Sequence, residues 1–173
     1  YSEEYEQRKD DPAYFGRKGL NPKFLPEIVK KAHQAGLRVS VHVNTPTDFH
    51  NAIISGADEI AHLPGYANDL KISLQDAKLA AKKNVVVVTT AVLVKGRNKD
   101  PNYDKFVENV KHNLKILKDA GVKLAVGSDE YNDTSFGEVT YLLETGVFSN
   151  LELLKMWSQN SAETIFPNRK IGK

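Results

Sequence analysis

The chain has 173 residues, of which 40% are hydrophobic and 27% charged, a composition typical of a single globular domain. At this length roughly 70% of the surface of the unfolded chain becomes buried on folding, which is enough for a substantial core. The 24 basic and 22 acidic residues are interspersed and give a net charge of +2. Because the charges do not form a long face of one sign, the sequence does not indicate nucleic acid or an anionic membrane surface as a partner.

Two features that the sequence lacks narrow the class of protein further. There is no cysteine, which excludes a disulfide framework and a thiolate nucleophile but leaves the compartment open. No apolar stretch approaches the roughly 20 residues that span a bilayer, and the polar segment 1–19 carries no targeting signal. We therefore expect a soluble chain of unknown localisation, and the absence of an initial Met suggests that it begins inside a longer protein.

Four passages share one pattern: a helical period, a stop residue and then a short strand. The stop residues are of the types that tolerate the left-handed conformation at the end of a helix. The passages are 25–43, 48–63, 73–90 and 103–129, and their stop residues are Gly36, Gly56, Asn84 and Gly121. Further helices are predicted over 134–145 and 150–166, with Gly146 between them.

The fourth passage predicts the longest helix, with one apolar stripe at a spacing of 3.6 residues. Its members are Tyr103, Phe106, Val107, Val110, Leu114 and Leu117. Because helices alternate with β-branched strands over short connections, the pattern indicates βαβ units. The predicted fold class is α/β, with parallel strands and alternating helices, in one domain over residues 1–173.

Three of the predicted strands end on residues that can bind a metal: His42, His62 and Asp129. Strict alternation places each of them opposite the more apolar side of its strand. If the apolar sides pack on helices, the three side chains converge at the carboxyl ends of the strands, where parallel α/β folds place their sites. A single histidine at a strand end is more often structural, but three coincident strand ends favour a site.

Two imidazoles and a carboxylate form a ligand set suited to Zn²⁺, Fe²⁺, Mn²⁺ or Ni²⁺. Such a metal polarises a carbonyl and lowers the pKa of bound water, while a neighbouring carboxylate takes the proton. The residues therefore point to metal-assisted hydrolysis. The other histidines, His33, His50 and His112, are expected at the surface.

Four runs in this order resemble the second half of the amidohydrolase superfamily barrel, in its imidazolonepropionase-like and Xaa-Pro-dipeptidase-like branch. They are "AHQAGLRVSVHV", "AIISGADEIAHLPG", "LAVGSDEYND" and "NSAETIF". The resemblance implies strands 5 to 8 of a TIM-type β/α barrel. It also implies that His42 and His62 are metal ligands on strands 5 and 6, and that Asp129 is the strand-8 metal ligand and catalytic general base.

The chain departs from that superfamily in lacking the first half of the barrel. No two histidines are two residues apart, so the His-x-His pair of strand 1 is missing. Many members also carry a lysine on strand 4 that bridges two metal ions as a carbamate, and in this chain that position would lie at or before Tyr1. The small β-sandwich domain that members of the superfamily build from both chain ends is missing as well. We therefore expect a fragment of a metal-dependent hydrolase of amide or cyclic C–N bonds, with zinc as the first candidate for the metal and iron or manganese as the alternatives. The isolated fragment is expected to bind metal weakly or not at all and to be inactive.

Four parallel strands cannot close a barrel, so the outer strands need a cover. The candidates are a second copy of the chain, the missing half, or segments 1–23 and 136–168, and we favour self-association. In the full-length protein the expected substrate is a small molecule or a dipeptide. An alternative interpretation is a non-catalytic α/β binding or assembly domain that keeps the barrel frame.

Polar residues in the loops that follow the strands are further candidates for contacts with a substrate. They are Asn44, Tyr66, Asn68, Arg97, Tyr131 and Asn132. Loops also favour such residues because they form turns, so a role in turn formation stays open as the alternative to substrate contact.

Overall fold

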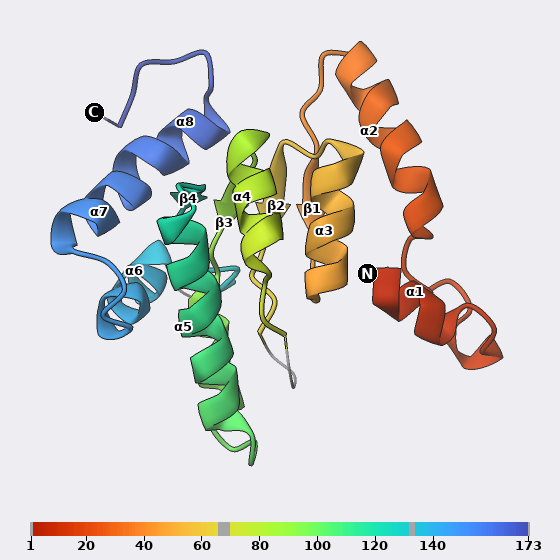
Figure 1. Ribbon diagram of the computed structural model, residues 1–173, viewed down its shortest axis with the longest axis horizontal. Coiled ribbons are helices and arrows are strands. Elements are labelled where there is room, and N and C mark those ends of the chain that lie inside the picture. Colours follow the sequence, from red (N-terminus) through yellow and green to blue (C-terminus); the bar gives the residue numbers. More distant parts are fainter. Residues whose placement is uncertain (1, 66–69, 132–133, 173) are drawn as a thin grey trace.

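The computed structural model describes residues 2–65, 70–131 and 134–172, in which short strands alternate with helices (Figure 1). The helices are α1 (Ser2–Arg8), α2 (Leu25–Gln34), α3 (Pro46–Ser55), α4 (Leu74–Lys82), α5 (Tyr103–Asp119), α6 (Ser135–Glu144), α7 (Asn150–Lys155) and α8 (Ser161–Ile165). The shorter helical segments are the 3₁₀ turns η1 (Pro12–Tyr14), η2 (Pro22–Phe24) and η3 (Ala91–Arg97) and the π-helical turn η4 (Met156–Asn160). Within the described ranges, no helix has the length and apolar character needed to cross a membrane.

The strands form one parallel sheet in the order β1-β2-β3-β4. They are β1 (Ser40–His42), β2 (Glu59–Ala61), β3 (Val86–Val88) and β4 (Lys123–Ala125). Their central residues are in register and buried in the core: Val41, Ile60, Val87 and Leu124. Helices α3, α4 and α5 lie over this face (Figure 1). The predicted α/β class, with parallel strands and alternating helices, is confirmed.

The predicted helix ends are confirmed by the backbone. Gly36, Gly56, Asn84 and Gly121 all have positive φ, between 56° and 87°, and each lies just after the end of its helix. Glycine adopts this conformation without a steric penalty and asparagine at a small one, which is why these residue types end the helices.

Helix α5 buries the stripe that its sequence predicts. Phe106, Val110, Leu114 and Leu117 are buried in the core, and Tyr103 and Val107 pack against it. This helix also buries Asn113. The Asn113 amide donates to the carbonyls of Pro64 and Leu70, at 2.6 and 2.9 Å, and its oxygen accepts from the Ile72 amide at 2.7 Å. Asn113 therefore ties both flanks of the connection after β2 to α5.

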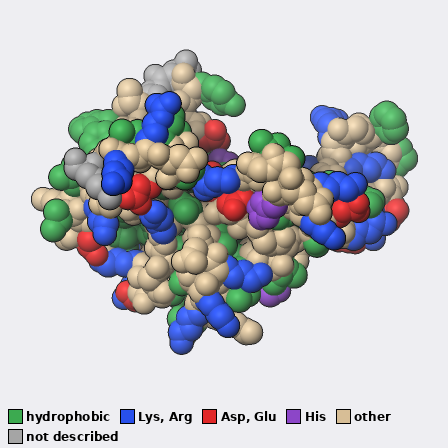
Figure 2. All heavy atoms as spheres, turned by 90° about the horizontal axis from the view of Figure 1, so that it is seen from above, with side chains coloured by type: hydrophobic (Ala, Val, Ile, Leu, Met, Phe, Trp, Pro, Cys, Tyr) green, Lys and Arg blue, Asp and Glu red, His purple; other side chains and the backbone are tan. Residues whose placement is uncertain are grey.

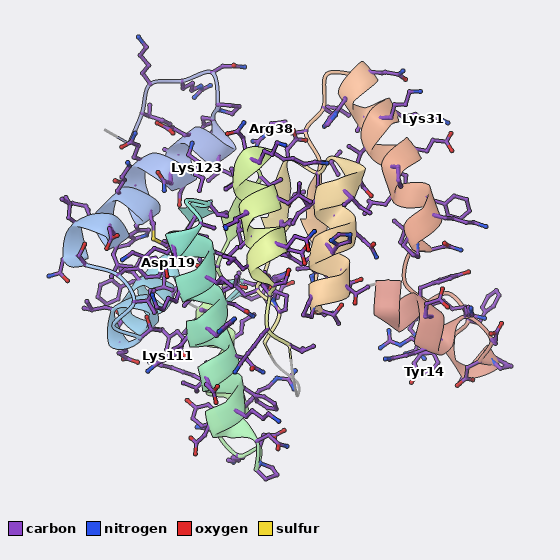
Figure 3. All side chains as sticks on the ribbon, viewed as in Figure 1. Tyr14, Lys31, Arg38, Lys111, Asp119 and Lys123 are labelled. Carbon is purple, nitrogen blue, oxygen red and sulfur yellow. The ribbon has the colours of Figure 1, made fainter. Side chains whose placement is uncertain are left out.

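The opposite face of the sheet is more open. Ser40 and His42 are exposed there, and Glu59, Ala61 and Val88 are half-buried. Seen from above, at the end where the strands begin, basic and acidic side chains lie interspersed over the surface (Figure 2). Arg38 lies at this end, where its guanidinium donates to the Thr164 carbonyl of α8 (Figure 3).

Part of the outer edge of β4 is covered by the turn between η4 and α8. The Asn160 amide donates to the Leu124 carbonyl at 2.8 Å, and the Ser161 hydroxyl accepts from the Val126 amide at 3.0 Å. Of the expected covers, segment 136–168 thus supplies one for β4. At the other edge the β1 side chains Ser40 and His42 remain exposed.

Candidate functional site

The carboxyl ends of the strands surround an open hollow of about 550 Å³. It is lined by His42, Asn44, His62, Leu93, Gly96, Arg97 and Asp129. These residues come from the ends of β1, β2 and β4 and from η3 after β3. The structure therefore brings the three predicted site residues to one hollow, at the end of the sheet that their positions predict.

His42 is the last residue of β1 and points to the open face of the sheet. Its neighbours Val41 and Val43 are buried in the core, so alternation within β1 is as predicted. The imidazole of His42 lies against that of His62, with ring centroids 4.6 Å apart and the planes at 75°. Two imidazoles at this separation can direct nitrogen atoms at one point between them.

His62 reaches the site by breaking the alternation of its strand, which corrects the prediction for β2. The core residue of this strand is Ile60, which shares the alternation phase of His62, so strict alternation would turn the imidazole into the core. Instead His62 has a φ of 76°, and Leu63 enters the core in its place. The left-handed backbone at a non-glycine residue is uncommon and marks local strain at the site.

The His62 ring is oriented by Thr90, which follows β3. Its Nδ1 lies 2.9 Å from the Thr90 hydroxyl oxygen. Burial lowers the pKa of His62, the neighbouring His42 lowers it further, and Asp129 opposes both. The ring is therefore biased toward the neutral form, which is the form that binds a metal.

Asp129 lies on the open side of the hollow. Its carboxylate is 4.0 Å from Nε2 of His62, and its side chain is 52% exposed. Alternation in this strand holds as far as Gly127, where an added Cβ would meet the Val88 side chain at 2.6 Å. Asp129 itself has a φ of 54°, so its place again depends on a left-handed residue.

The donor set fits a divalent metal in its chemistry but does not form a complete site. In the part of the chain that the structure describes, no three His, Cys, Asp or Glu side chains are placed to hold a metal ion together. Two ligands of one tetrahedral zinc ion lie about 3.4 Å apart, so the 4.0 Å between Asp129 and His62 is slightly long. His42, His62 and Asp129 remain the residues that would hold such an ion.

The loop candidates for substrate contact are divided by the structure. Asn44 and Arg97 line the hollow, whereas Tyr131 is 97% exposed and is not among the lining residues. Tyr66, Asn68 and Asn132 lie outside the described residues. His33 and His50 are exposed, as expected, and each lies against a carboxylate, Asp58 at 2.8 Å and Asp76 at 2.7 Å.

Sequence reasoning missed two residues that shape the site, Thr90 and Leu93. The tandem threonines at the end of "VVVVTT" were the available signal, because they close the strand that lies between the two histidines and the aspartate. Their importance depends on the hydrogen bond of Thr90 to His62, which joins residues 28 positions apart.

Comparison with known proteins shows the family of the chain. A sequence profile of the amidohydrolase family matches residues 13–173. The chain belongs to the amidohydrolase family. The resemblance that the sequence motifs indicate is thereby confirmed.

Solved structures of other proteins share the fold of this amidohydrolase chain. An amidohydrolase is 26% identical with a TM-score of 0.71, and the match covers 90% of this chain and 39% of that one. A prolidase complexed with N-methylphosphonate-L-proline is 24% identical with a TM-score of 0.70, over 89% and 39% of the two chains. A Xaa-Pro dipeptidase with methionine in its active site is 20% identical with a TM-score of 0.71, over 88% and 39%. The chain thus spans about two-fifths of the length of these structures. No curated protein sequence matches it.

Proposed function

We propose that this chain is the carboxyl-terminal half of a metal-dependent amidohydrolase that cleaves an amide or cyclic C–N bond. The observation that carries the proposal is the convergence of His42, His62 and Asp129 on one hollow, in a chain of the amidohydrolase family. In this proposal residues 1–173 are a single partial barrel, and the first half of the barrel and a β-sandwich domain complete the protein.

His42, His62 and Asp129 would hold a divalent metal, for which zinc is the first candidate and iron or manganese the alternatives. When bound, the metal would polarise the scissile carbonyl and lower the pKa of water at the site. Asp129 is the general base: its exposed carboxylate takes a proton from the attacking water and delivers it to the leaving nitrogen. Thr90 keeps the His62 ring in place through Nδ1.

The substrate class follows from the wall of the hollow. Arg97 and Asn44 supply a guanidinium and an amide beside the predicted metal ligands. A guanidinium binds a carboxylate through paired hydrogen bonds, so a substrate with a free carboxylate, such as a dipeptide, fits this wall. The prolidase and Xaa-Pro dipeptidase among the similar structures support the same class.

The rival function is a non-catalytic binding or assembly domain. The observation that favours it is that the described residues contain no complete three-ligand group. The two functions differ in metal content. We expect purified protein to take up zinc weakly, and His42→Ala and His62→Ala to abolish that uptake, as measured by mass spectrometry of bound metal and by titration calorimetry.

Lys71→Ala is the matched control for these variants, since Lys71 pairs with Glu108 on the surface at 2.6 Å. Zinc uptake equal in the wild type and both histidine variants would contradict the proposal, and no uptake at millimolar zinc would favour the rival function. We also expect no turnover of dipeptides or cyclic amides by the isolated chain. If the isolated chain turned over such a substrate and Asp129→Asn abolished the turnover, the expected inactivity of the isolated chain would be contradicted.

Self-association belongs to the same proposal. The sheet has four parallel strands, so two copies together contain the eight strands of a barrel. In such a pair β1 of one copy would lie beside β4 of the other, so the turn that covers β4 would have to move aside.

A further inference from the structure

Glu138 of α6 is a charged residue fully buried in the molecule, and the mechanism above makes no use of it. Its exposed fraction is 0%. One carboxylate oxygen accepts from the Thr89 hydroxyl at 2.5 Å and from the Ala91 amide at 2.9 Å, and the other accepts from the Val92 amide at 2.6 Å. All three donors belong to one short stretch, where β3 passes into η3.

The three donors explain why a carboxylate is present at this position. Burial raises the pKa of Glu138, and the hydrogen bonds from Thr89, Val92 and Ala91 oppose that effect. A buried carboxylate is costly unless donors surround it, and an apolar residue would pack here at no such cost. Glu138 therefore stabilises the stretch 89–92 to which it is hydrogen-bonded, in addition to packing α6.

That stretch lacks a cap of its own. The N-cap of η3 is Thr90, whose side chain makes no capping hydrogen bond, so the first amides of the turn need another acceptor. Glu138 supplies it from a helix that lies more than 40 residues further along the chain. The carboxylate thus binds the Thr89 side chain before Thr90 and the backbone amides of Ala91 and Val92 after it.

Thr90 depends on this support because its backbone is strained. It is β-branched and yet has a φ of 47°, a conformation that such residues rarely adopt. Its amide donates to the Gly127 carbonyl at 2.9 Å, and in this position its hydroxyl oxygen lies 2.9 Å from Nδ1 of His62. A relaxed Thr90 would carry its hydroxyl away from the ring.

We infer that Glu138 is a positioning residue for His62: it clamps Thr89, Ala91 and Val92, and so holds the Thr90 hydroxyl on Nδ1 and leaves Nε2 facing the hollow. The inference deepens the proposed function and rests on it, since the orientation of His62 matters for catalysis only if the ring binds a metal. Glu138 itself touches neither imidazole nor Asp129 in the described contacts; it acts through the 89–92 stretch.

The test uses Glu138→Gln and a readout in the metal-free chain. Glutamine keeps the shape of the side chain but replaces one acceptor oxygen by an amide group, which is itself a donor and opposes the donors around it. At about pH 8 the ring of His62 is neutral, and the ¹⁵N shifts of its two nitrogens report which of them carries the proton. His62→Ala assigns the signals.

We expect one dominant tautomer of His62 in the wild type. Glu138→Gln and Thr90→Val are both expected to give ¹⁵N shifts averaged over the two tautomers of His62. Thr90→Val removes the hydroxyl, and Glu138→Gln releases it from its fixed position. Leu142→Ala is the matched control, because Leu142 is fully buried one turn further along α6 and its loss weakens the same helix without touching the carboxylate. Its His62 shifts are expected to stay as in the wild type.

Three results would overturn the inference: wild-type shifts in Glu138→Gln, averaged shifts in the wild type itself, or averaged shifts in Leu142→Ala. Zinc titration of the same proteins then separates this inference from the proposed function. If both hold, Glu138→Gln weakens zinc binding by about 10- to 100-fold. The expected tautomer pattern without any zinc binding would support the positioning role and contradict the metal-dependent function.

Discussion

The imidazole rings of His42 and His62 lie edge to face, with their centroids 4.6 Å apart, although 20 positions of sequence separate them. The parallel pairing of β1 with β2 brings the two strand ends together, because Val41 is in register with Ile60 and His42 with Ala61. His62 is one residue beyond that register, and its left-handed backbone turns its ring back toward His42. This pair is the centre of the candidate site.

The close approach of β4 to β3 predicts the effect of a methyl group at Gly127. An added Cβ would lie 2.6 Å from the Val88 side chain, so the strands must separate or Val88 must change rotamer. We expect Gly127→Ala to lower the free energy of unfolding by about 1–3 kcal/mol in urea denaturation. Gly96→Ala, where nothing lies within 4 Å, is the control and should change stability by less than about 0.5 kcal/mol. Equal effects of the two changes would contradict the close approach.

Asn113 predicts how strongly the connection after β2 depends on α5. Asn113→Ala leaves the Ile72 amide and the carbonyls of Pro64 and Leu70 without this partner. Because a buried group left unsatisfied costs about 1–3 kcal/mol, we expect a loss of at least about 2 kcal/mol in the free energy of unfolding. Asn98→Ala, at an exposed position, serves as the control. A loss at Asn113 as small as the loss at Asn98 would count against this role.

The capping box of α7 predicts a pH dependence of stability. The backbone amide of Ser149, the Lys118 ammonium and the Ser149 hydroxyl lower the pKa of Glu152 from 4.5 to about 2. Between these values the unfolded chain binds more protons than the folded one, so stability rises with pH. The contribution of the Glu152 carboxylate is complete above pH 4.5 and is lost as the pH falls through about 2.

Unfolding of the wild type and Glu152→Gln in urea at several pH values measures this contribution. We expect the wild type to be the more stable protein at pH 6, and the difference to shrink toward pH 2. Glu27→Gln is the control, since the Glu27 carboxylate pairs with exposed Lys31 at 3.0 Å. A difference independent of pH would argue against the lowered pKa.

The cover of β4 predicts how self-association responds to mutation. Asn160→Ala together with Ser161→Ala frees the Leu124 carbonyl and the Val126 amide for pairing with another strand. We expect the fraction of dimer in sedimentation velocity to rise at equal protein concentration. Gln159→Ala is the matched control, because the Gln159 amide donates to Glu163 at 2.9 Å. A double variant that stays monomeric at high micromolar concentration would contradict self-association through this edge.

Much of the fold could be predicted because its determinants are local. A glycine or asparagine ends each of the helices α2, α3, α4 and α5 through its own backbone freedom, and the apolar stripe of α5 needs only the helical period. The parallel sheet follows from the order of helices and strands. These local features suffice to predict that His42, His62 and Asp129 lie at the same end of the sheet.

The alternation of side chains between the two faces of a strand is a local rule as well. It predicted correctly which side chains of β1 face the core, but it was wrong for β2. The rule assumes an extended backbone, whereas His62 and Asp129 have left-handed φ values of 76° and 54°. Such a conformation is costly for these residues, so contacts from other elements must hold it. For His62 one such contact is Thr90, 28 residues further along the chain.

The sequence by itself determined the α/β order, the helix ends, the family and the end of the sheet where the site lies. Only the tertiary structure decided how His62 enters the hollow, why Glu138 is buried beside Thr90, and what covers β4. The physical reason is that the first group depends on the backbone preferences of single residues and on the periods of helices and strands. The second group consists of hydrogen bonds between segments 28 to 49 residues apart, whose partners are set only when the chain is folded.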